Sequence, residues 1–92
     1  MTSVYWVLRR LDAPRDRPGR KRLADVIART IAADRRFRHQ AAADEQITSA
    51  RNMLIHRWVM TGVSTEIARG FGDELAAWIA ESLARLRGEG PP

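Results

Sequence analysis

A chain of 92 residues is the length of a single domain, and a chain this short buries only about 60–65% of the surface that its unfolded form exposes. Its hydrophobic content of 45% and charged content of 29% favour a folded globular protein, with little room for a deep substrate pocket. The lack of cysteine excludes disulfides and thiolate metal sites, and no segment approaches the about 18 consecutive apolar residues of a membrane helix. We therefore expect a soluble, cytoplasmic protein that does not enter a membrane.

The N-terminal segment, residues 3–11, fits two kinds of secondary structure. A helix would place four apolar side chains on one face: Val4, Val7, Leu8 and Leu11. A strand would instead align Val4, Trp6 and Leu8, and Val, Tyr and Trp favour strands. We favour the helix and keep the strand as the alternative. The short apolar run is followed, not preceded, by arginines, which is not the pattern of a signal peptide.

The following segment is rich in proline and in positive charge. Two prolines within residues 12–19 remove backbone donors and fix φ, which predicts a linker. Between Arg9 and Arg22, seven cations outnumber two acids, so this stretch carries the whole net charge of +5. A general preference for arginine codons does not explain that concentration. We expect one helical domain over residues 1–92, with a basic, proline-containing linker at residues 12–19.

Two helices are predicted next, over residues 20–38 and residues 44–62. The first has an apolar face in which Leu23, Ile27 and Ile31 are spaced by four. The second begins near two acidic residues, which suit a helix N-terminus, and ends at Gly62. Because its apolar residues cover most of its circumference, we expect it to be the central helix or to meet a partner.

The last predicted helix begins with Ser64 as its N-cap and ends near Gly88. Small residues recur along it every four positions and form a ridge suited to close packing: Ala68, Gly72, Ala76, Ala80 and Ala84. Residues 64–83 also resemble a helix-turn-helix motif, with Gly72 in the turn. The second helix of such a motif would present three acids to DNA: Asp73, Glu74 and Glu81. We therefore expect an uninterrupted helix and no recognition helix. The fold class is all-α, a compact bundle of three main helices with a possible N-terminal helix or strand.

The basic segment is the strongest functional signal in the sequence. Guanidinium groups bind phosphates in a bidentate manner, and a basic segment gains affinity by releasing counterions. The leading hypothesis is a non-enzymatic accessory or regulatory factor that contacts the DNA or RNA backbone through seven residues: Arg9, Arg10, Arg15, Arg17, Arg20, Lys21 and Arg22. The alternative is that this segment is a solvated linker that keeps the protein in solution.

A rival hypothesis is a helical interaction module or inhibitor that docks on a partner protein with an acidic surface. Three tryptophans are a large apolar load for a small core, and an exposed apolar patch marks a contact surface. We expect a homodimer, and the candidate interface residues are Trp6, Trp58, Gly72, Ala76, Trp78 and Ala80.

Catalytic and metal sites are not predicted. His39 and His56 are the only histidines, and neither has acidic residues at a clear ligand spacing. No Ser–His or paired-carboxylate spacing indicates a mechanism, and Gly70 and Gly72 are not followed by the Lys-Ser/Thr pair of a phosphate-binding loop. We expect neither an enzyme nor a cofactor.

Overall fold

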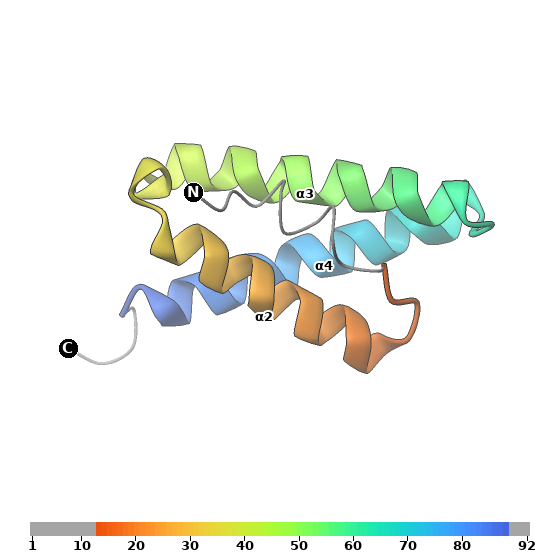
Figure 1. Cartoon of the computed structure of the whole chain (residues 1–92), viewed down its shortest axis with the longest axis horizontal. Helices are drawn as coiled ribbons and strands as arrows, with labels where there is room; N and C mark the ends of the chain where they lie inside the picture. Colours follow the sequence, from red (N-terminus) through yellow and green to blue (C-terminus); the bar gives the residue numbers. More distant parts are fainter. Residues whose placement is uncertain (1–12, 89–92) are drawn as a thin grey trace.

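The computed structural model describes residues 13–88, which form three long α-helices and one short 3-10 helix, with no strand among them. In chain order these are α2 (Arg17–Ala33), η1 (Arg35–Phe37), α3 (Gln40–Met60) and α4 (Thr65–Leu86). The expected all-α bundle of three main helices is confirmed for this part of the chain (Figure 1). The expectation for residues 3–11 lies outside the described residues. Within the described range, none of the helices has the length and apolar character that would let it cross a membrane.

The helices alternate in direction along the chain: α2 and α4 run the same way, and α3 runs in the opposite direction (Figure 1). Close backbone packing joins α4 to α2 and α4 to α3, whereas α2 and α3 approach each other much less. The central helix is therefore α4, so the first of the two alternatives expected for the helix over residues 44–62, a central position, is wrong. On α3 one strip is fully buried, while Val59 and Met60 are exposed.

The predicted linker at residues 12–19 is too long, because α2 begins at Arg17. The carboxylate of Asp16 accepts a hydrogen bond of 2.7 Å from the Gly19 backbone N–H and caps the helix. Pro18 fits in the first turn, where its missing N–H would have no helical partner. A Cβ atom at Gly19 would lie only 2.7 Å from the Asp16 carboxylate, so glycine permits this tight cap.

The predicted helix over residues 20–38 is interrupted at Asp34. Its side chain accepts a hydrogen bond of 2.9 Å from the backbone N–H of Arg36, which starts η1 as a separate turn. The next helix starts at Gln40 and not near position 44, because the alanines that follow are strong helix formers. It ends before Gly62, which has a φ of 103°, a conformation that glycine adopts without strain.

The start and continuity of α4 agree with the sequence. Ser64 is the N-cap, and its hydroxyl accepts a hydrogen bond of 3.3 Å from the Ile67 backbone N–H. The helix continues through Gly70 and Gly72, so the turn of a helix-turn-helix motif does not form here. At Gly72 the missing Cβ atom leaves room for Ile55 of α3.

The core lies where α2 and α3 meet α4, and Trp58 is its largest side chain. Trp58 is 0% exposed, and its ring meets the ring of Phe71 edge-on with centroids 5.3 Å apart. Its indole N–H donates a hydrogen bond of 3.3 Å to the backbone carbonyl of Ala13. The chain that leads into α2 is thus attached to the core through α3.

Candidate nucleic-acid interface

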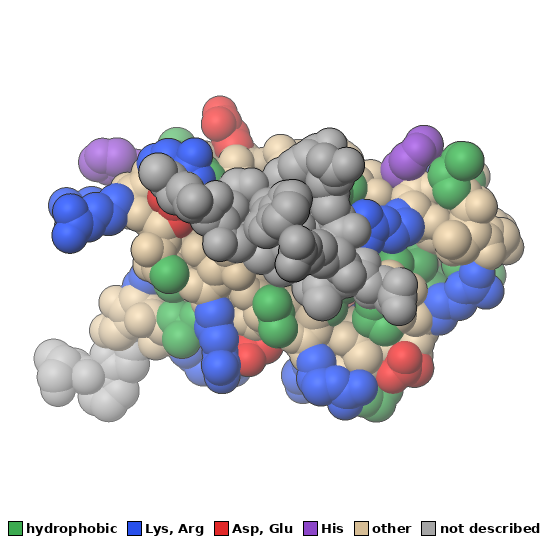
Figure 2. Space-filling model, in the orientation of Figure 1, with side chains coloured by type: hydrophobic (Ala, Val, Ile, Leu, Met, Phe, Trp, Pro, Cys, Tyr) green, Lys and Arg blue, Asp and Glu red, His purple; other side chains and the backbone are tan. Residues whose placement is uncertain are grey.

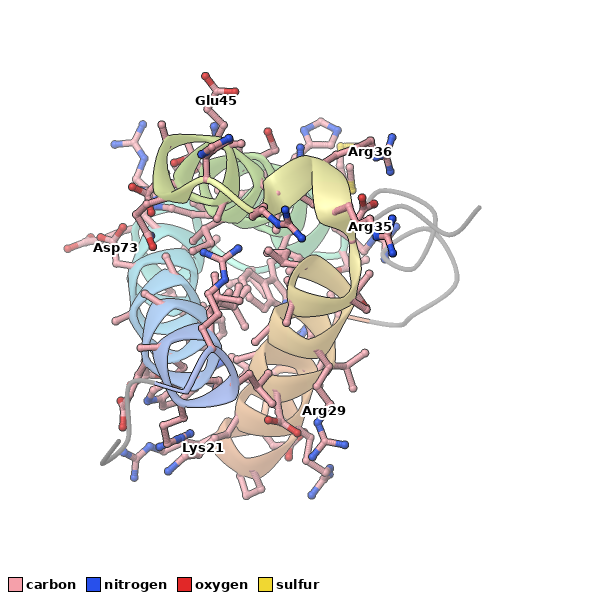
Figure 3. The ribbon with its side chains drawn as sticks, turned by 90° about the vertical axis from the view of Figure 1, so that its left-hand side faces the viewer. Lys21, Arg29, Arg35, Arg36, Glu45 and Asp73 are labelled. Atoms are coloured by element: carbon pink, nitrogen blue, oxygen red, sulfur yellow. The ribbon has the colours of Figure 1, made fainter. Side chains whose placement is uncertain are left out.

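The positive charge of the described residues is concentrated on α2. This helix carries five cations and a single acid, Asp25, whereas α4 carries two cations and four acids. Figure 2 shows Lys and Arg side chains along the lower edge of the molecule, where α2 lies. In the end-on view of Figure 3, Lys21 lies beside α4 and Glu45 projects from the far side of α3. The bundle therefore has a basic side formed mainly by α2.

Arg20 differs from the other cations of α2, because it is buried and only 7% exposed. Its guanidinium forms an ion pair of 2.7 Å with Glu74 and lies 4.0 Å from the centroid of the Phe71 ring. It also donates a hydrogen bond to the carbonyl of Arg15, while its Nε has no hydrogen-bond partner among residues 13–88. Arg20 fastens α2 to α4 and offers no surface to a polyanion, so we remove it from the predicted contact residues.

Arg17 and Lys21 both lie over the ring of Trp78, a half-buried tryptophan of α4. Their charged ends are 5.7 Å and 5.9 Å from the centroid of the Trp78 ring. A cation over an aromatic face is attracted weakly at exposed sites, by about 0.5–1 kcal/mol. Both cations are exposed, so this contact orients them without burying their charge.

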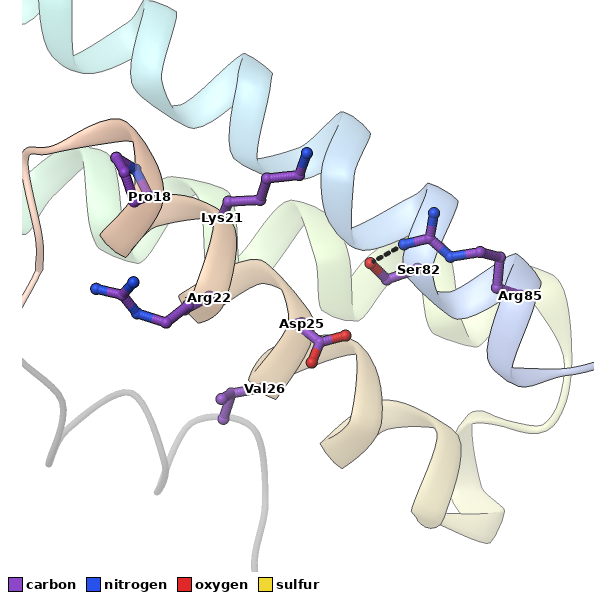
Figure 4. Close-up of a pocket in the computed structure, with 7 residues that line it drawn as sticks. All are labelled: Pro18, Lys21, Arg22, Asp25, Val26, Ser82 and Arg85. Carbon is purple, nitrogen blue, oxygen red and sulfur yellow. Dashed lines mark hydrogen bonds between the residues drawn. The ribbon is translucent and has the colours of Figure 1, made fainter.

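A groove with a volume of about 560 Å³ follows the first half of α2 (Figure 4). Its lining comes from α2 and α4 and consists of Pro18, Lys21, Arg22, Asp25, Val26, Ser82 and Arg85. The carboxylate of Asp25 pairs with Arg29 at 3.1 Å, outside this lining. Arg85 pairs with Glu81 at 3.2 Å and donates a second hydrogen bond of 3.2 Å to the Ser82 hydroxyl. Two cations therefore remain in the groove without a carboxylate partner among the described residues, Lys21 and Arg22.

The groove, with Arg17 beside it, defines the candidate interface. No model of a known protein family, no curated protein and no solved structure matches this chain. Of the other predicted contact residues, Arg15 is exposed and donates a hydrogen bond to the Thr61 carbonyl at the end of α3. Arg9 and Arg10 lie outside the described residues.

A second basic cluster lies at the opposite end of α2 and was missed in the sequence. Three arginines line a cavity of about 280 Å³: Arg35, Arg38 and Arg87. The rest of its lining is the end of α2, Ala32 and Ala33, with the C-cap residue Asp34. Arg87 donates a hydrogen bond to the Phe37 carbonyl, which brings the end of α4 to η1. The run Arg35-Arg36-Phe37-Arg38 was a visible signal, but the balance of charges over the rest of the chain concealed it.

The acid in this cluster, Asp34, already forms an ion pair with Arg36. Arg36 binds the Asp34 carboxylate at 2.6 Å, and the hydrogen bonds from its side chain and backbone hold the pKa of Asp34 below its usual value. The same carboxylate raises the pKa of Arg36. Asp34 is thus directed to Arg36 and leaves Arg35 and Arg38 without an ion pair in the part of the chain that the structure covers.

The residues proposed for a protein interface are divided between core and surface. Trp58 and Gly72 are buried within their own bundle, so neither is available to a partner in this fold. Ala76 is half-buried against the core, and Trp78 is half-buried beneath two cations. Ala80 is exposed. The small-residue ridge is used at least in part to pack α4 on α3, and Trp6 lies outside the described range.

The two histidines are exposed and lie at different places on the bundle. His39 is the N-cap residue of α3 and makes no side-chain capping bond within the described part of the chain, and His56 lies in the second half of the same helix. Among residues 13–88, no group of three or more His, Cys, Asp or Glu side chains is placed to hold a metal ion.

Proposed function

We propose that this protein is a non-enzymatic binding factor that contacts the phosphodiester backbone of nucleic acid through the first half of α2. The observation that carries the proposal is the groove between α2 and α4, where Lys21 and Arg22 are exposed and have no carboxylate partner in the described structure. Arg17 adds a third exposed cation beside this groove.

The chemistry of these side chains suits phosphate. The planar guanidinium of Arg17 or Arg22 matches two phosphate oxygens, and the ammonium of Lys21 supplies a compact charge. Neutralised phosphates release their counterions, which is the main source of affinity in sequence-independent binding. Contacts of this kind fix position without reading bases, so we expect weak sequence preference, as in an accessory or regulatory factor.

The contact with Trp78 favours this function in a second way. Long cationic side chains lose rotamer freedom when they bind a ligand, which reduces affinity. Arg17 and Lys21 are already oriented by the ring beneath them, so part of that cost is met before binding.

The proposal is tested with single substitutions of two exposed helical arginines, Arg22→Ala in the groove and Arg69→Ala on α4 as the charge-matched control. Affinity for duplex DNA, duplex RNA and single strands is measured between about 50 and 200 mM salt, where each duplex phosphate contact contributes a log–log slope of about −0.9. We expect R22A to bind more weakly and its log–log slope to become shallower by about 0.9, the contribution of one phosphate contact. R69A should keep the affinity and the slope of the wild type. Absence of a complex at low salt on all three probes, or equal losses in the two variants, would refute the proposal.

A second candidate, a helical module that docks on another protein or on a second copy, is favoured by exposed apolar residues around the turn between α3 and α4. Met60 is 72% exposed and Ile67 is 54% exposed, and Val59 is also exposed. Light scattering tests whether the chain self-associates. Met60→Ser with Ile67→Ser would then convert a dimer into a monomer if this surface is the interface.

A further inference from the structure

The two basic clusters lie along the same seam of the bundle. The groove is lined by Lys21 and Asp25 of α2 together with residues of α4, and the second cavity by Ala32 of α2 together with Arg87 after α4. Positions 21, 25 and 32 follow the helical period and lie on one side of α2. Both clusters therefore open beside the line where α2 meets α4.

Their separation follows from the geometry of the helix between them. Ala32 lies ten positions after Arg22, which corresponds to about 15 Å at a rise of 1.5 Å per residue. Phosphates of one DNA strand recur about every 3.4 Å along the duplex axis, so a duplex of about five base pairs is as long as this distance. A single phosphate group is too small to reach both clusters, whereas a short stretch of backbone is long enough.

We infer that one nucleic-acid backbone bridges both clusters, with Lys21 and Arg22 at one end and Arg35 and Arg38 at the other. This inference rests on the proposed function and extends it, because it assigns a second contact site and an orientation along α2. The charges support it: Asp34 is held by Arg36, and Arg35 and Arg38 are exposed and have no ion pair in the described structure. A mononucleotide or inorganic phosphate would occupy one cluster at a time and bind far more weakly.

The test compares three variants in salt titrations on a duplex of about 12 base pairs: K21A/R22A, R35A/R38A and the fourfold combination. Each double variant should reduce the log–log slope by about 1.8 and the fourfold variant by about 3.6, while R69A leaves it unchanged. Far-ultraviolet circular dichroism confirms that the exposed substitutions leave the bundle folded. Saturation with the duplex should give a complex of one protein and one duplex.

The outcomes separate the two levels of the proposal. If R35A/R38A keeps the wild-type slope while K21A/R22A loses it, the second cluster is not a contact site and only the groove remains. If one protein binds two short duplexes, the clusters are separate sites and the bridging arrangement is wrong. If the wild-type protein binds no duplex at low salt, the proposed function itself fails.

Discussion

Arg20 and Glu74 form a partly buried ion pair of 2.7 Å that joins the first turn of α2 to the middle of α4. The guanidinium also lies 4.0 Å from the Phe71 ring centroid, so one side chain combines a charge pair, an aromatic contact and a helix junction. Its burial distinguishes it from Arg17, three positions earlier, which is exposed.

Replacement of Arg20 by alanine should therefore destabilise the fold. Loss of the guanidinium leaves Glu74 without its partner and opens space beside Phe71, and we expect a cost of about 2–4 kcal/mol. Arg17→Ala serves as the control and should cost no more than about 1 kcal/mol, which is the contribution expected from its contact with Trp78. Urea denaturation of both variants measures the difference. Equal stability of the two variants would show that the buried pair does not hold α2 in place.

Glycines 70 and 72 should respond to alanine in opposite directions. At Gly70 an added Cβ meets no atom of the described residues within 4 Å, and Gly70→Ala should stabilise α4 by about 0.5–1 kcal/mol through helix propensity. At Gly72 the added Cβ would lie 2.6 Å from Cδ1 and Cγ1 of Ile55, and Gly72→Ala should cost about 1–3 kcal/mol. Thermal melts of the two variants provide the comparison. A stabilising Gly72→Ala would mean that Ile55 turns aside without cost.

Asp34 should make part of the stability depend on pH. Hydrogen bonds from Arg36 lower the pKa of Asp34 in the folded state, so the stability that it contributes is fully present above its unfolded pKa of about 3.9. That contribution is lost as the pH falls through the lower folded pKa. Asp34→Asn keeps a side chain that caps η1 but removes the charge. The difference in unfolding free energy between wild type and D34N is measured by denaturation from neutral pH to below the unfolded pKa of Asp34. This difference should become smaller as the pH falls.

A constant difference between these two proteins down to the lowest pH would contradict the assignment. It would show that Asp34 contributes only by accepting hydrogen bonds, with no gain from the attraction between its charge and that of Arg36.

Trp78 should report on ligand binding through its fluorescence. Arg17 and Lys21 lie over its ring, and a polyanion that neutralises their charges changes the electrostatic environment of the indole. In a Trp6→Phe background, nucleic acid should change the emission, and additional replacement of Trp78 by Phe should abolish the change. Trp58 is fully buried and serves as the internal reference. A response that survives in the double variant would come from Trp58 and would indicate a rearranged core.

The features that were predictable from sequence are those that depend on neighbouring residues. Helical periodicity located all three long helices, and Ser64 was recognised as an N-cap because its partner, Ile67, is three positions away. The continuity of α4 through Gly72 followed from the acids that come after it. The interruption at Asp34 was not predicted, although its partner is also local, because an aspartate within an apolar period is equally compatible with a solvated helix face.

The role of each charge was not predictable in the same way. Arg20 and Lys21 are adjacent in sequence, yet Arg20 is buried against Phe71 and Lys21 lies on the surface. The rotation of α2 about its own axis, which its packing on α4 sets, decides which of the two side chains faces inward. Arg87 joins η1 through the Phe37 carbonyl, a partner that lies 50 positions away. Contacts of this kind depend on tertiary packing, which the order of residues does not reveal.

The hydrogen bond from Trp58 to Ala13 has a consequence for how the bundle opens. If the segment that contains Ala13 and leads into α2 came away from α3, the indole N–H of Trp58 would lose its acceptor. An unsatisfied N–H in an apolar interior costs about 1–3 kcal/mol. The same indole also packs on Phe71, so α2, α3 and α4 share one anchoring side chain. Separation of α2 alone is therefore disfavoured, and amide protons in the middle of all three helices should exchange with solvent through a single cooperative opening.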